Sequence, residues 1–205
     1  EKPMKSEFPS LMAIVLLAAA TGLRPEVKAA DSTPPGPTAA GAYLSPTALA
    51  ATADGKTLFI AQATANQVAV FDTERGVVTK TLAMPDSPLG LILAADGRRL
   101  YVTCAAPESS VVVVDTAQGS IVTKHPAGHT AMSPVLSPDG RTLYVCNRFE
   151  NTVSALDLGS GRELFRVRVP REPVAADVTR DGKHLLVANH LHAGAADQDY
   201  VAASV

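Results

Sequence analysis

The 205-residue chain contains no tryptophan, and aromatic side chains make up only 4% of it. Small and branched aliphatic residues must therefore fill any core, and abundant Val and Thr with frequent Gly and Pro favour short strands joined by turns. The 18 Lys and Arg residues are nearly balanced by 20 Asp and Glu residues, for a net charge of −2. Because no basic stripe is present, the sequence argues against a nucleic-acid partner.

Cysteine is equally scarce, with only Cys104 and Cys146 in the chain. There is no CxxC or CxxCH motif, so we expect no dithiol redox site and no cofactor in this chain. Cys104 follows Asp96 by eight residues, whereas Cys146 follows Asp139 by seven. In equivalent strands these positions point to opposite faces, which favours two free thiols over a disulfide, the alternative.

Long apolar runs are absent except for "LMAIVLLAAA", residues 11–20, which is ten residues long. That length is too short for a membrane span and suits the core of a signal peptide. The following "EVKAAD" predicts cleavage after Ala29, which gives a signal peptide at 1–29 and a flexible linker at 30–43. We therefore expect a periplasmic, secreted or cell-surface protein without a transmembrane segment after signal removal. A buried helix of the mature fold is the alternative.

Repetition dominates the remainder of the chain. Near-copies of one pattern begin at Asp-Gly pairs that are 42, 43 and 42 residues apart, at Asp54, Asp96, Asp139 and Asp181. A fixed period of this size is the signature of a repeat architecture.

Each period contains four strand-like runs, which the third repeat shows most clearly. "SPVLS" leads to an Asp-Gly turn, "TLYVCN" returns, "NTVSALDL" follows, and "RELFRVRV" closes the unit. Asp-Gly suits a tight hairpin because both central residues can take positive φ. A four-stranded antiparallel sheet of about 42 residues is the blade of a β-propeller, and blades repeat because neighbours bury each other's faces.

The strings "LYVTC", "LYVCN", "SPDG" and "VVVVDT" resemble the YVTN-type β-propeller repeat, over residues 44–205. The resemblance implies an all-β propeller with four-stranded blades. We place the blades at 46–83, 89–125, 132–169 and 174–205. The fourth blade stops within its expected third strand, which leaves about 3.75 of the seven blades common in this family. We therefore expect an N-terminal fragment of a longer propeller.

Two sets of connections, from second to third strands and from blade to blade, are expected on one face because strand directions alternate. Loops on a rigid scaffold are common binding sites. Five residues of these loops are the ligand-binding candidates: His129, Arg148, His190, His192 and Asp197.

The fourth repeat carries an insertion in this region, "HLHAGAADQD". Two histidines with neighbouring carboxylates would suit a transition metal ion, but the spacing fixes no third ligand, so a polar surface loop is the preferred interpretation and no metal is predicted. No Ser-His-Asp ordering or nucleophile elbow appears, so no catalytic residue is proposed.

The densest charged run is "GRELFRVRVPREP", in which Arg166 and Arg168 share one face of a strand. We expect a solvated outer strand that is protected from edge pairing. A binding site for an anion or partner is the alternative.

Three functions are compatible with these features. The first is an exported, non-catalytic scaffold that binds a protein or small ligand on the loop face, as in surface-layer-like proteins with this repeat. The second follows from "SPVLSPDGRTLYVCNRFENTVSALDL", which resembles propellers joined to a c-type cytochrome domain and, more distantly, quinoprotein propellers. Haem c would then belong to a domain downstream of Val205. The third is a lactonase-like propeller hydrolase.

Overall fold

The computed structural model describes residues 43–191. The predicted signal peptide (1–29), nearly all of the predicted linker (30–43), and the last part of the fourth repeat (192–205) lie outside the described residues. None of the helical segments between 43 and 191 has the length and apolarity of a membrane span.

The described chain forms three four-stranded antiparallel sheets and one two-stranded sheet, and strands pair in chain order. The first sheet contains β1 (Pro46–Ala51), β2 (Thr57–Gln62), β3 (Gln67–Asp72) and β4 (Val77–Ala83). The second contains β5 (Ser87–Leu93), β6 (Arg99–Ala105), β7 (Ser110–Asp115) and β8 (Ser120–Pro126). The third contains β9 (Ala131–Leu136), β10 (Thr142–Asn147), β11 (Thr152–Asp157) and β12 (Glu163–Arg168), with the 3₁₀ helix η1 (Arg148–Glu150) between β10 and β11. The fourth contains β13 (Pro173–Val178) and β14 (Leu185–Asn189).

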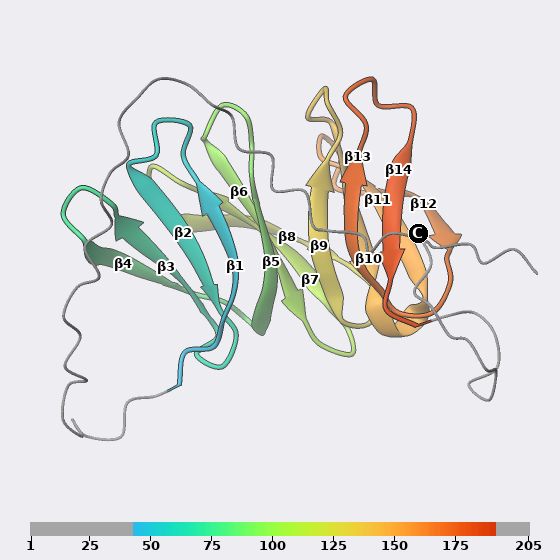
Figure 1. The fold of residues 1–205 in the computed structure, drawn as a ribbon, viewed down its shortest axis with the longest axis horizontal. Coiled ribbons are helices and arrows are strands. Elements are labelled where there is room, and N and C mark those ends of the chain that lie inside the picture. The colour runs from blue at the N-terminus through green and yellow to red at the C-terminus, as the bar shows by residue number, and fades with distance from the viewer. Residues whose placement is uncertain (1–42, 192–205) are drawn as a thin grey trace, which may run out of the picture. The chain divides into compact units, whose positions relative to one another are not determined.

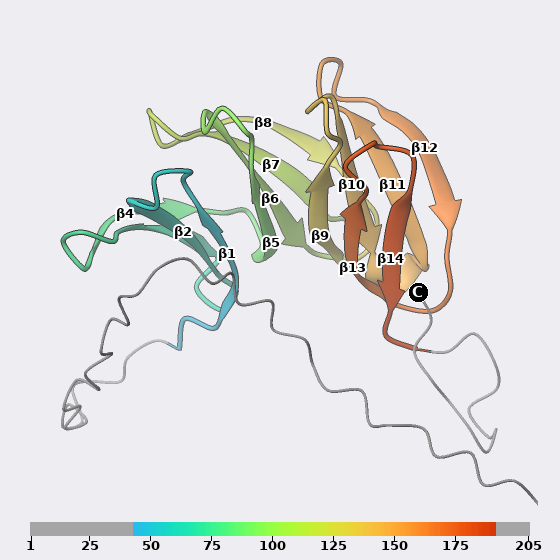
Figure 2. The ribbon, with the colours of Figure 1, turned by 45° about the horizontal axis from the view of Figure 1, so that its top comes forward.

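The sheets follow one another along the chain, with the first strands of consecutive sheets in contact (Figures 1 and 2). Apolar side chains on both faces of the middle strands fill the space between sheets, as "VVVV" in β7 illustrates with four buried valines. One core cluster joins the first and second sheets, and another joins the second and third. The outer strands β4, β8 and β12 are largely exposed. This arrangement is the predicted β-propeller with four-stranded blades.

The Asp-Gly hairpins have a different geometry from the one expected. Only the glycine has positive φ, 68° at Gly140, so the turn is not a two-residue turn with both central residues left-handed. Instead the Gly140 N–H donates to the Ser137 carbonyl at 2.8 Å, and the Ser137 N–H donates to the Thr142 carbonyl at 2.8 Å. The Asp139 carboxylate completes the turn by accepting bonds from the Ser137 hydroxyl at 2.6 Å and the Arg141 N–H at 3.1 Å.

The same hydroxyl-to-carboxylate bond recurs in two other turns. Thr52 donates to Asp54 at 2.6 Å, and Thr179 donates to Asp181 at 2.5 Å. The hydroxyl bond, followed by the backbone N–H bond, lowers the pKa of Asp54 and of Asp181 because both stabilise the ionised carboxylate. The motif S/T-x-D-G therefore forms a turn in which the Asp carboxylate is hydrogen-bonded to groups of the turn itself.

Both cysteines are free, as expected, and both are fully buried. Cys104 belongs to the core between the first two sheets, with Val68 and Val102. Cys146 follows Val145, which packs toward the second sheet, so the Cys146 thiol points the other way. Burial raises the pKa of each thiol to about 12, which keeps both protonated and unreactive.

Gly90 in β5 lies directly against the third sheet. A Cβ at this position would lie 2.4 Å from Pro134 Cδ, 2.8 Å from Thr103 Oγ1 and 3.0 Å from the Ser133 backbone nitrogen. The Pro134 ring and the Ser133 backbone belong to the neighbouring sheet, so neither can move without shifting β9. Glycine is therefore required here by space.

We predict that Gly90→Ala lowers the free energy of unfolding by about 1–3 kcal/mol, because the added methyl group overpacks the sheet interface. Chemical denaturation followed by circular dichroism measures this change. Gly159→Ala is the matched control, since a Cβ at Gly159 would find its nearest atoms at 3.7 and 3.9 Å. Equal stability of the two variants would contradict the prediction.

Candidate functional site

The connections fall on two opposite faces because successive strands alternate in direction. The Asp-Gly turns and the turns between third and fourth strands lie on one face (Figure 1). The other connections form what we call the loop face, which comprises residues 63–66, 84–86, 106–109, 127–130, 148–151 and 169–172, with 190–191 after β14. Three of the predicted site residues lie on this face.

Phe149 in η1 is exposed on the loop face, with 51% of its surface accessible. The Arg148 guanidinium carbon lies 5.0 Å from the centroid of the Phe149 ring, in a cation–π contact. The His129 ring meets the same ring edge-on, with the centroids 5.3 Å apart and the planes at 79°. An aromatic ring is thus presented to solvent between two polar side chains.

Backbone hydrogen bonds hold η1 against the connection between β8 and β9. The Arg148 N–H donates to the Thr130 carbonyl at 3.2 Å, and the Phe149 N–H donates to the His129 carbonyl at 3.4 Å. In return, the His129 N–H donates to Glu150 Oε1 at 2.9 Å. The backbone of Phe149 is therefore held against the connection between β8 and β9.

A buried amide beneath η1 fixes the same connection. Asn147 Oδ1 accepts a bond from the Gly128 N–H at 3.0 Å, and its Nδ2 donates to Thr152 at 3.0 Å and Ser154 at 2.8 Å. A Cβ at Gly128 would lie 2.5 Å from Glu150 Oε2 and 2.6 Å from Asn147 Cγ. The loop therefore rests on a hydrogen-bonded base and requires glycine at one contact.

A second cluster of polar side chains connects the third sheet to the fourth. Arg148 donates to Glu172 Oε2 from Nε at 3.0 Å and from Nη2 at 2.7 Å. His190 Nδ1 lies 3.3 Å from the same oxygen and 3.4 Å from Arg148 Nη2. Glu172 has φ of 55°, and its N–H donates to Asn151 Oδ1 at 2.8 Å. Arg148, and then His190, lower the pKa of Glu172 by stabilising its ionised form.

Arg166 extends this network to the outer strand. It forms ion pairs with Glu150 in η1 and with Glu163 in β12, the latter at 2.8 Å. Hydrogen bonding to Arg166 lowers the pKa of Glu163, and its bond to Glu163 raises the pKa of Arg166. Strand β12 is exposed throughout, as expected, but Arg166 is also a structural link to the loop face.

The structure brings together three of the five predicted residues, namely His129, Arg148 and His190. His192 and Asp197 lie outside the described residues. Phe149 and Glu172 were not predicted: Phe149 was one apolar residue within "NRFEN", and no spacing rule links residue 148 to residue 172.

His125 lies in β8, outside the loop face. Its ring occupies the space of a side chain at Gly161, with Cε1 2.4 Å from an added Cβ.

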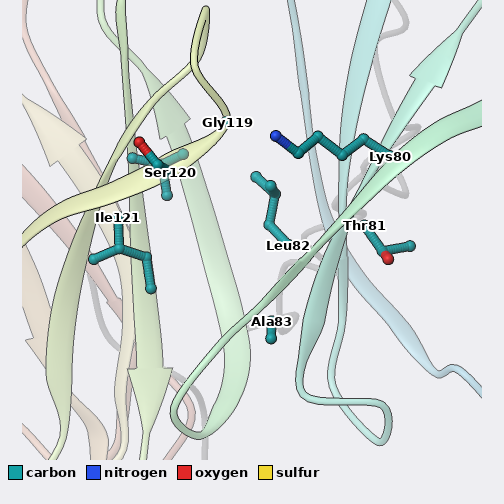
Figure 3. Close-up of a pocket in the computed structure, with 8 residues that line it drawn as sticks. Lys80, Thr81, Leu82, Ala83, Gly119, Ser120 and Ile121 are labelled. Atoms are coloured by element: carbon teal, nitrogen blue, oxygen red, sulfur yellow. The ribbon is translucent and has the colours of Figure 1, made fainter.

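The described residues also form hollows outside the loop face. One lies between β4 and the β7–β8 hairpin, where Lys80 reaches across toward Gly119 (Figure 3). Its Nζ donates to the Gln118 carbonyl at 2.9 Å, so this lysine is used for contact between sheets. Within residues 43–191 there is no group of three or more metal-ligating side chains.

Comparison with known proteins supports the fold. The chain is similar to a hydrazine synthase of Kuenenia stuttgartiensis, with 25% identity, a TM-score of 0.67, and 77% of this chain and 46% of that chain covered. It is also similar to U3-55K, a WD40 propeller, with 14% identity, a TM-score of 0.64, and 73% and 47% covered. The chain thus spans about half the length of these structures. No protein-family model and no curated protein matches the sequence.

We predict that Glu172→Gln weakens the acid sensitivity of the fold. The pKa of Glu172 is lower in the folded chain than its ordinary value of 4.5, so its ionised form stabilises the fold above pH 4.5 and this contribution is lost as the pH falls further. Thermal melting between pH 7 and pH 3 should therefore show a smaller decrease for Glu172→Gln than for the wild type, from a lower starting value. Glu74→Gln, which removes the exposed pair with Lys56, is the control. An unchanged acid decrease in Glu172→Gln would contradict the prediction.

Proposed function

We propose that this propeller is a non-catalytic binding scaffold whose loop face contacts a protein partner. The proposal rests on Phe149. Its aromatic side chain is half exposed, while its backbone is held in place by hydrogen bonds. Aromatic residues of this kind form the centres of protein interfaces because they bury a large area at low entropic cost.

The charges around Phe149 favour a protein over an anionic small ligand. Arg148 is paired with Glu172, and Arg166 is paired with Glu150 and Glu163. Because these guanidinium groups are already neutralised, they form a polar rim rather than an anion site. An apolar pocket on the partner, bordered by polar groups, is the complementary surface.

Photo-crosslinking tests this proposal in cells that naturally produce the protein. A photoreactive residue at Phe149 should yield one discrete adduct. The same residue at Val122 should not, because Val122 is equally exposed (52%) but lies in the outer strand β8. With the captured partner purified, Phe149→Ala should weaken binding by about 2 kcal/mol or more, as expected of an interface centre. Equal adducts from both positions, or none from Phe149, would refute the proposal.

The proposal also includes the cellular compartment in which the protein acts. The apolar run at residues 11–20 and the predicted cleavage after Ala29 support export to the periplasm or cell surface, where a surface-layer-like role would be exercised.

A redox-linked propeller is the second candidate, and the similarity to a hydrazine synthase at 25% identity favours it. Under this alternative the propeller would carry a c-type cytochrome domain encoded downstream of Val205. Haem staining of the full gene product after denaturing electrophoresis should then be positive, because haem c is covalently attached. A negative stain would contradict this alternative.

A further inference from the structure

One of the four Asp-Gly turns lacks the hydroxyl group that holds the aspartate in the others. In three turns the carboxylate accepts a hydrogen bond, at 2.5 or 2.6 Å, from a Ser or Thr hydroxyl two residues earlier; these are the turns of Asp54, Asp139 and Asp181. The residue two positions before Asp96 is Ala94, which has no hydroxyl. Within the described part of the chain, the Asp96 carboxylate accepts a single hydrogen bond, from the Arg98 N–H at 2.9 Å.

The first turn matches the second closely apart from this hydroxyl. The Gly55 N–H donates to the Thr52 carbonyl at 2.9 Å, and the Gly97 N–H donates to the Ala94 carbonyl at 2.8 Å. Both glycine carbonyls accept a bond from a threonine hydroxyl, at 2.7 Å and 2.6 Å, and their φ angles are 70° and 71°. The two turns therefore hold the backbone in the same way and differ in how they hold the aspartate side chain.

An Asp-Gly pair can rearrange with no reagent except water, because glycine has no Cβ to shield its backbone nitrogen. The glycine nitrogen attacks the aspartate Cγ, an N–Cγ bond forms, and the carboxyl OH leaves with the N–H proton as water. The resulting cyclic imide takes up one water molecule. Cleavage of its bond to the original backbone carbonyl leaves isoaspartate, with the mass and oxidation state of the chain unchanged.

The hydroxyl bond opposes this reaction in two ways. The carboxyl group reacts in its protonated form, and the hydroxyl bond is the largest of the causes that lower the pKa of Asp54, Asp139 and Asp181. The bond also fixes the carboxylate, so that Cγ must leave a hydrogen-bonded position before it reaches the glycine nitrogen. Ala94 supplies neither effect to Asp96.

We propose that Asp96 is a site of spontaneous isoaspartate formation in the folded protein, with Gly97 supplying the attacking nitrogen. The product has a main chain one carbon atom longer between β5 and β6. It displaces Gly97 from its bonds with the Ala94 carbonyl and the Thr116 hydroxyl, which loosens the turn between these strands. The reaction needs no partner, so this inference is independent of the proposed function.

Ageing of the purified full chain at neutral pH, followed by peptide mapping with electron-transfer dissociation, tests the proposal. This fragmentation distinguishes isoaspartate from aspartate at each Asp-Gly pair. Asp96 should convert at least about five-fold faster than Asp54, since hydrogen bonds to charged groups typically contribute at least this factor. Equal rates at Asp54 and Asp96 would overturn the proposal.

Substitutions can add or remove the hydroxyl group. Ala94→Ser supplies it and should lower the rate at Asp96 to that of Asp139, whereas Ser137→Ala should raise the rate at Asp139 by about five-fold. Ala95→Ser is the matched control, because it adds the same hydroxyl one residue later and should leave the rate at Asp96 unchanged. An unchanged rate at Asp96 in Ala94→Ser would contradict the protective role of the hydroxyl.

Ageing in guanidinium chloride separates the effect of the folded turn from that of the local sequence. In the unfolded chain the hydroxyl bonds are lost, so the four Asp-Gly pairs should convert at similar rates. A faster conversion of Asp96 that persists in the unfolded chain would overturn the proposal, because the adjacent residues alone would then explain it.

Discussion

The contact between neighbouring sheets is the constraint on which the structure depends. A four-stranded sheet of this chain is apolar on both faces of its middle strands, so one sheet alone cannot bury its own side chains. Burial is complete only where two sheets meet, as for Val102 and Val112 in the second sheet, both fully buried. The sheets must also match in shape, which is why glycine is required at position 90.

The packing of neighbouring sheets also brings the connections of the loop face together, so that they hold one another in place. The η1 loop is bonded to the connection that precedes its own sheet, and through Glu172 to the connection that follows it. Phe149 is thus supported from two neighbouring connections, although it lies in a loop. Because the loop is already ordered before binding, little conformational entropy is lost when its aromatic side chain enters an interface.

Much of the fold could be predicted from the sequence because its determinants are local. The period of the Asp-Gly pairs, the alternation within "TLYV" and the hydroxyl residue two positions before Asp54, Asp139 and Asp181 are all visible in short windows. The candidate site could be predicted only in part. Its face follows from strand direction, but the pairing of Arg148 with Glu172 joins residues 24 positions apart through the packing of two sheets. No periodicity in the chain encodes that contact.

The close approach at Gly90 shows that the first repeat could not replace the second in this chain. The equivalent positions in the other sheets are Ala48, Ser133 and Ala175, counted six residues before each Asp-Gly pair. A chain in which the first repeat were copied into the second place would bring the Ala48 methyl group onto the Pro134 ring. The junction between the second and third sheets therefore requires a specific fit, and a different residue at position 90 would require a matching change in β9.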